Sequence, residues 1–128
     1  MWSNRAARTR SFSVTPEGRD TQVAWIGTEP EPPYQRDDFL TMLYSGWLAG
    51  RATLLGLLDA REARLRAQTR QVRGDMARLM AQHPAEIKDP ADWRFCRYVL
   101  QTRRMMLAQT ELLWCQSMIE RLKDSDDG

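Results

Sequence analysis

Residues 92–123, DWRFCRYVLQTRRMMLAQTELLWCQSMIERLK, decide the fold of this chain. Their apolar residues recur at steps of three, four and seven, and this spacing places them on one face of an α-helix. Arginine, glutamine and glutamate occupy the other side, so the pattern predicts an amphipathic helix and not a fully buried one. The predicted face contains Trp93, Cys96, Leu100, Leu107, Trp114, Met118 and Leu122, and it is widened by Val99, Met106 and Leu113.

This helix is too long to be covered by the remainder of the chain. At about 1.5 Å per residue it extends over about 48 Å, more than a chain of 128 residues can bury against itself along the whole length. Asp89 before Pro90 is typical of an N-cap followed by a first-turn proline, with Asp92 then in the first turn. We therefore predict a helix that starts near Pro90 and requires a partner.

A second long helix is predicted from Arg51 to about Gln82. Gly50 provides a break before it, and His83-Pro84 closes it. Residues 85–89 then form a turn that reverses the chain, so the two helices should make a long antiparallel hairpin. The inner face of the second helix is a heptad of aliphatic residues, Leu58, Leu65, Val72 and Leu79.

The N-terminal part has a different character. Phe12 and Val14 alternate with polar residues, the pattern of a short half-buried strand. Thr15-Pro16 reads as an N-cap and a first-turn proline, which predicts a short helix from Pro16 to Ile26. Its inner side would be formed by Val23, Trp25 and Ile26.

The region around 28–35 is a proline-rich linker, since its prolines remove hydrogen-bond donors and clash with a helical turn. It is predicted to separate residues 1–27 from a helical domain at 36–128. That domain opens with a compact helix, Phe39 to Leu48, which is apolar around most of its circumference and should be packed on several sides.

Composition bounds the class of protein. The chain is 42% hydrophobic and 28% charged, which is ordinary for a folded protein. No apolar run approaches the roughly 20 residues of a membrane span, and no secretory signal opens the chain, so a cytoplasmic protein is expected. Lys88 and Lys123 are the only lysines. The many arginines suit a partner with phosphate, carboxylate or aromatic groups, or they form a solvated surface in an organism that favours arginine codons.

Neither catalysis nor a metal site is expected. Cys96 and Cys115 lie about 28 Å apart on the same predicted helix and cannot pair within one chain, so they should be reduced thiols in or near the core. His83 is the only histidine, and there is no ligand set at metal spacing. No phosphate loop or nucleophile elbow occurs. We expect no cofactor, no metal and no enzymatic activity.

Several motifs occur together in a particular order. Residues 10–19, RSFSVTPEGR, precede Ala24-Trp25-Ile26, and further motifs lie at 31–40, 54–61 and 111–122. In this order they resemble the PadR-type winged-helix transcriptional regulators that have a long C-terminal helical domain. The resemblance implies a mainly α protein with a long antiparallel hairpin, shorter helices, and an N-terminal strand left over from the wing. The helix-turn-helix is missing, which indicates a fragment, a mis-called start or a stand-alone module.

The resemblance also implies partners. It implies a homodimer formed through residues 92–123 and the helix containing Leu40 to Leu48, in agreement with the uncovered apolar face. A small aromatic effector could bind between subunits, although plain core packing explains the same residues. The residues assigned to the interface or effector pocket are Trp47, Trp93, Leu100, Leu107, Trp114 and Met118.

The basic arm is a third candidate site. Arg5, Arg8 and Arg10 lie where the wing of the resembling family approaches DNA, and they predict weak, salt-dependent contact with the backbone. The alternative is a charged arm with no partner. Without a recognition helix, no sequence-specific DNA binding is expected. The competing function is a DNA-independent helical adaptor that uses the same apolar faces to bind another protein.

Overall fold

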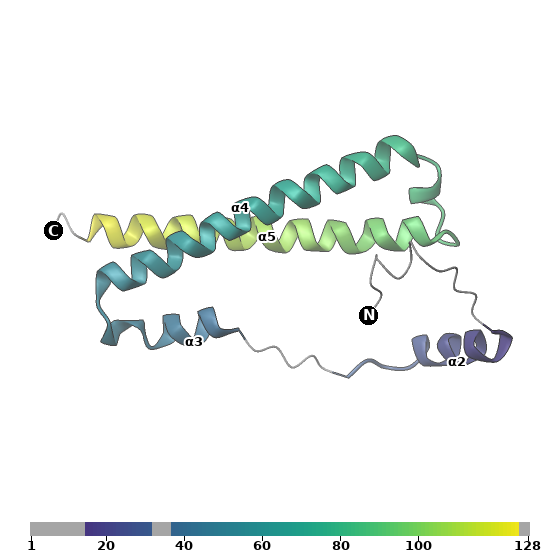
Figure 1. Cartoon of the computed structure of the whole chain (residues 1–128), viewed down its shortest axis with the longest axis horizontal. Helices are drawn as coiled ribbons and strands as arrows, with labels where there is room; N and C mark the ends of the chain where they lie inside the picture. Colours follow the sequence, from purple (N-terminus) through teal and green to yellow (C-terminus); the bar gives the residue numbers. More distant parts are fainter. Residues whose placement is uncertain (1–14, 32–36, 126–128) are drawn as a thin grey trace. The chain divides into compact units, whose positions relative to one another are not determined.

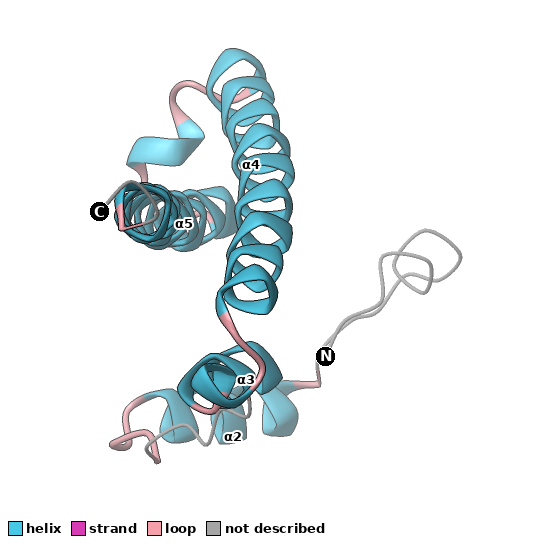
Figure 2. Cartoon of the chain, turned by 90° about the vertical axis from the view of Figure 1, so that its left-hand side faces the viewer, coloured by secondary structure: helices cyan, strands magenta, loops and turns pink. Residues whose placement is uncertain are grey.

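The computed structural model describes residues 15–31 and 37–125, which are helical with short connections and contain no strand (Figures 1 and 2). The predicted strand at Phe12 and Val14 lies outside these ranges. The chain divides into two units, residues 1–36 and 37–128. The elements are α2 (Pro16–Ile26), α3 (Asp38–Tyr44), the 3-10 helix η1 (Gly46–Leu48), α4 (Arg51–Gln82), the 3-10 helix η2 (Glu86–Lys88) and α5 (Trp93–Asp124).

The predicted helical hairpin is confirmed. α4 and α5 run antiparallel and are joined by the turn that contains η2, with α4 inclined across α5 (Figure 1). α3 packs beside the start of α4. The helical bounds at Arg51, Gln82 and Ile26 agree with the predicted ones. None of the helices in the described ranges carries a stretch hydrophobic enough for a membrane span.

The heptad on α4 forms its inner face, as predicted. Leu58, Leu65, Val72 and Leu79 are all buried, and Val72 is only 1% exposed. Thr69 is buried among them, and its hydroxyl donates a hydrogen bond of 2.8 Å to the Leu65 carbonyl, so this buried polar group is satisfied. The regular spacing of large aliphatic residues therefore determines how α4 packs.

The face of α5 that packs on α4 is not the predicted one. The buried residues of α5 are Met105, Ala108, Cys115 and Ile119, whereas Leu100 and Leu107 from the predicted face are largely exposed. Ala108 and Cys115 are small, and small side chains let two helix backbones approach closely enough for the large aliphatic residues of α4 to interlock. Apolar periodicity does not distinguish this stripe from the more conspicuous tryptophan and leucine stripe.

The ends of the long helices have clear local causes. Gly50 precedes α4 with φ of 96°, a conformation that favours glycine. The N-cap of α5 is Asp92, whose side chain accepts a hydrogen bond of 2.8 Å from the Arg94 N–H. The predicted cap at Asp89 is therefore wrong: its carboxylate instead accepts from the Ala91 N–H in the preceding turn.

Two other expectations need correction. The predicted compact helix ending at Leu48 is split at Ser45 into α3 and η1, and most of its apolar side chains are exposed instead of packed on several sides. Gly46 is the buried residue of η1 and lies against Leu54. α2 starts at the predicted Thr15 cap, whose hydroxyl accepts from the Gly18 N–H, but none of its described residues is buried.

Candidate functional site

A broad apolar face of α5 is left uncovered in the single chain. Trp93 is 66% exposed, Leu100 68% and Leu107 52%. Three more large side chains, Val99, Met106 and Leu113, are exposed beside them. At 100° per residue, Val99, Met106 and Leu113 lie roughly opposite the stripe that packs on α4, whereas Trp93, Leu100 and Leu107 lie about a quarter turn from it. α5 therefore carries a second set of apolar side chains that α4 does not cover.

Large exposed apolar side chains gathered along one helix are typical of a surface that is buried in an assembly. Cys96 and Arg103 lie within the uncovered face, and both are exposed. The Arg103 stem is aliphatic and can lie across neighbouring apolar groups while its guanidinium stays at the edge. Burial of this face therefore requires the Arg103 guanidinium to extend to the rim of the interface.

The α3–η1 segment exposes a second set of apolar side chains. Trp47 is 75% exposed and Leu48 is 72% exposed. Leu40, Met42 and Tyr44 are also exposed on α3. An exposed tryptophan beside an exposed leucine is costly in water, and contiguous apolar surface of this kind marks sites of protein interaction. Both exposed sets belong to unit 37–128.

Trp114 and Met118 are placed differently from the other predicted interface residues. They are half-buried and pack against the core of their own chain. The Trp114 ring meets the Phe39 ring edge to face, with 6.3 Å between centroids and an interplanar angle of 89°. These two side chains pack α3 against the hairpin. They therefore fit the core-packing alternative, and not an exposed interface or effector pocket.

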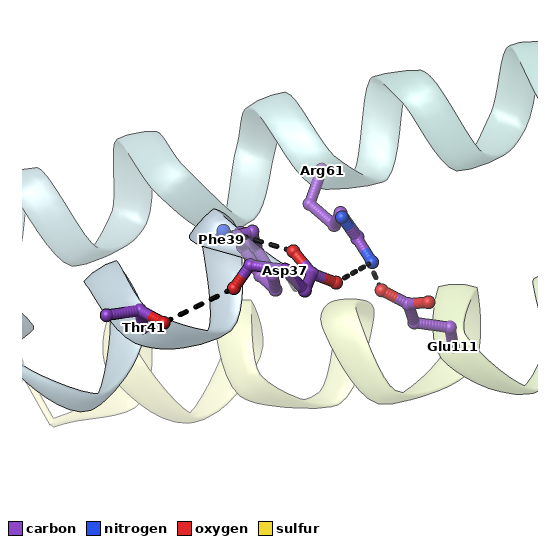
Figure 3. A network of polar contacts seen from close by, with 5 residues as sticks. All are labelled: Asp37, Phe39, Thr41, Arg61 and Glu111. Atoms are coloured by element: carbon purple, nitrogen blue, oxygen red, sulfur yellow. Dashed lines mark hydrogen bonds and ion pairs between the residues drawn. The ribbon is translucent and has the colours of Figure 1, made fainter. Parts of the chain in front are cut away.

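A polar cluster holds α3 in place (Figure 3). The Asp37 carboxylate caps α3 by accepting from the Phe39 N–H at 3.0 Å, and its other oxygen accepts from Arg61 of α4 at 3.1 Å. Arg61 also donates to Glu111 of α5 at 2.5 Å, and its guanidinium lies 4.5 Å from the centroid of the Phe39 ring. Arg61 therefore joins all three helices.

The electrostatics of this cluster are favourable. The hydrogen bond to Glu111 raises the pKa of Arg61 more than its burial lowers it, and the nearby Asp37 raises it further. The Arg61 side chain is only 13% exposed, so its attraction to two carboxylates is screened less than on the open surface. The exposed apolar residues of α3 are thus presented from a fixed position.

A second polar cluster lies where α5 begins. Arg94 Nε and Nη2 donate to the Asp92 carboxylate at 2.9 and 3.2 Å, and Arg94 Nη1 lies 2.9 Å from His83 Nδ1 at the end of α4. Hydrogen bonds from the Arg94 side chain and N–H lower the pKa of Asp92. The Arg94 guanidinium also lies 5.4 Å from the Trp93 ring centroid. The exposed Trp93 ring therefore lies against Arg94, which is itself held by the N-cap residue Asp92.

The two thiols differ in environment. Cys115 is fully buried, and burial raises the pKa of its thiol, with a smaller contribution from Glu111. Cys96 is exposed, which corrects the expectation that both lie in the core. Within the described residues, no three His, Cys, Asp or Glu side chains are grouped so that they could hold a metal ion.

Of the sequence-predicted site residues, the structure leaves Trp47, Trp93, Leu100 and Leu107 exposed and places Trp114 and Met118 against the core. Arg5, Arg8 and Arg10 lie outside the described residues. The Asp37–Arg61–Glu111 cluster was not predicted from the sequence. The pattern that could have predicted it is a charged residue, Arg61, one turn after Leu58 on the inner side of α4. In an antiparallel hairpin this arginine lies opposite an acidic residue of α5, Glu111.

Comparison with known proteins identifies one family. The family model described as Virulence activator alpha C-term matches residues 35–123. No curated protein and no solved structure shows a significant match. The resemblance to PadR-type regulators is therefore corrected, because the matching family is a different one and its match begins after the residues interpreted as a wing. Since the match covers most of the sequence, this chain belongs to the virulence activator alpha C-terminal family.

Proposed function

We propose that residues 37–128 form the self-association domain of a transcription activator, and that two copies bury the exposed face of α5 together with α3 and η1. Family membership supports the role of a C-terminal regulatory portion. The observation that carries the proposal is the second apolar side of α5, along which Trp93, Leu100 and Leu107 are all more than half exposed.

A second copy is the occupant that this surface favours. The stripe runs along α5 from Trp93 to Leu113 and is centred near Arg103, so a two-fold axis near Arg103 overlaps the whole stripe with its copy. Such an axis makes the two α5 helices antiparallel and places Leu100 of one copy beside Leu107 of the other. Self-complementary two-fold contacts of this kind are the commonest form of soluble oligomer.

The same axis accounts for the second exposed set. α3 packs near the C-terminal half of α5 in its own chain, through Phe39 and Trp114. In an antiparallel pair, that end lies beside the N-terminal half of the partner's α5. Trp47 and Leu48 are then within reach of the partner's Trp93 region, so one interface covers both exposed sets. In an activator, such a dimer would set the spacing between two DNA-reading heads.

The test is a charge introduced into the centre of the stripe. Leu100→Glu and Leu107→Glu should convert a dimer to a monomer, because each would place an ionised carboxylate in the apolar stripe that the dimer buries. Gln71→Glu is the control, since Gln71 is exposed on α4 and is not part of the uncovered face of α5. Size-exclusion chromatography with light scattering gives the mass, and circular dichroism reports whether each variant keeps its helices.

The competing function is a helical adaptor that uses the same surface for a different protein. It predicts a monomer at every concentration and a loss of hetero-complex, instead of self-association, in Leu107→Glu. An unchanged dimer in both glutamate variants would instead mean that the copies associate through another surface. Either result contradicts the proposed interface.

A further inference from the structure

A small apolar cavity lies within unit 37–128, where α3, α4 and the C-terminal half of α5 meet. Its volume is about 220 Å³. The walls come from Leu43 of α3, Leu54 of α4, and Trp114 and Met118 of α5. Because these side chains belong to one chain, the cavity is already formed in a single copy.

The wall at Leu54 is held in position by a close approach. Gly46 of η1 is buried, and a Cβ atom built on it would lie 2.3 Å from Leu54 Cδ2. The absence of a side chain at Gly46 therefore lets η1 pack directly on Leu54. On the opposite wall, Trp114 is held by its edge-to-face contact with Phe39. Leu54 and Trp114 are thus both half-buried and held by packing contacts.

One charged residue, Arg121, lies in this otherwise apolar lining. Within the part of the chain that the structure describes, its guanidinium makes no ion pair, in contrast to Arg61, which binds two carboxylates. The other cation of the last turn, Lys123, lines a separate polar groove with Asp59, Glu62 and Glu120. The cavity therefore combines apolar walls with one cation, Arg121, and its lining contains no acidic residue.

We propose that this cavity binds a small amphipathic monocarboxylate, whose hydrocarbon part fills the space between α3 and α5 and whose carboxylate meets Arg121. Small-molecule sites are commonly apolar with a few polar groups that fix orientation. A volume of about 220 Å³ suits a ligand of about ten non-hydrogen atoms, such as octanoate. Since α3 forms one wall, an occupied cavity would also stabilise the position of α3.

The experiment is isothermal titration calorimetry of the full chain with octanoate. For a ligand of this size the expected dissociation constant is on the order of 1 mM. Hexane-1-sulfonate keeps an anionic head on a shorter chain, and 1-octanol keeps the chain without the charge; both should bind more weakly. Arg121→Gln should weaken octanoate binding by about fivefold, the size of a partly exposed ion pair, and leave 1-octanol binding unchanged.

Two further variants separate the cavity from general surface binding. Leu43→Trp places a larger side chain in the wall and should abolish binding of octanoate and 1-octanol alike. Arg73→Gln removes an exposed arginine of α4 that lines none of these cavities and should bind octanoate like the wild type. Circular dichroism confirms that each variant is folded.

Three results would overturn the proposal. Equal octanoate affinity in wild type and Arg121→Gln would remove the role of the cation. Unchanged binding in Leu43→Trp would place the ligand elsewhere. Binding that disappears as protein concentration rises would mean that a second copy fills the cavity, a result that leaves the proposed dimer intact.

Discussion

Arg61 of α4 and Glu111 of α5 are joined by a hydrogen-bonded ion pair of 2.5 Å, although 50 positions separate them in the sequence. The same guanidinium reaches Asp37 at 3.1 Å, the residue that caps α3. Arg61 therefore links α4 to α5 and also holds α3 in its position. The position of the exposed residues on α3 depends on this cluster.

Arg61→Met should destabilise the helical unit by about 2 kcal/mol, because it removes the ion-pair partner of two half-buried carboxylates, Glu111 and Asp37. The matched control is Arg78→Met. The Arg78 side chain is paired with Asp75 and is 67% exposed. That change should cost less than about 0.5 kcal/mol. Urea unfolding followed by circular dichroism measures both, and equal losses would show that the Arg61 cluster is only a surface contact.

Leu58→Ala should destabilise the unit by about 3 kcal/mol, because Leu58 is 2% exposed at the centre of the core cluster and its loss leaves a cavity. Met80→Ala is the comparison near the other end of α4, where the side chain is 46% exposed. It should cost well under about 1 kcal/mol. A small effect at Leu58 would contradict the assigned inner face of α4.

Asp92→Ala should lower the thermal midpoint at neutral pH, because Asp92 caps α5 and binds the Arg94 side chain. The pKa of Asp92 is lowered in the folded state, so its contribution is present above the unfolded pKa near 4 and is lost as pH falls through the lower folded value. Melting curves of wild type and variant should therefore converge below about pH 4. A difference that grows on acidification would contradict the assignment.

The two cysteines should react at very different rates with an aromatic disulfide reagent. Cys96 is exposed and should react first, whereas Cys115 is buried with a raised pKa and should react only when the helices separate. Because Cys96 lies within the uncovered face of α5, its rate should also fall as protein concentration rises. The variants Cys96→Ser and Cys115→Ser assign each phase, and a Cys96 rate independent of concentration would place it outside the interface.

The helices were predictable from the sequence because their signals are local. The α4 heptad from Leu58 to Leu79, the Thr15 cap and the breaks at Gly50 and His83 each depend on residues close in sequence. The choice of packing face on α5 was not predictable, because that helix has two apolar sides and only the fit of Ala108 and Cys115 against α4 selects between them.

The candidate site was predicted in part for the same reason. The stripe of Trp93, Leu100 and Leu107 is evident from spacing, whereas the coverage of Trp114 depends on α3. The Arg61–Glu111 pair and the cavity beside Arg121 also require α4 and α5 to be placed against each other. Long-range registration of this kind cannot be derived from periodicity along one helix.

The most direct measurement is sedimentation equilibrium of the full chain from about 1 to 100 µM. If the uncovered side of α5 is a self-association surface, the mass should approach twice the 14.9 kDa of one chain at tens of micromolar, and Leu107→Glu should keep the single-chain mass. A wild-type chain that stays at 14.9 kDa up to 100 µM would contradict the account.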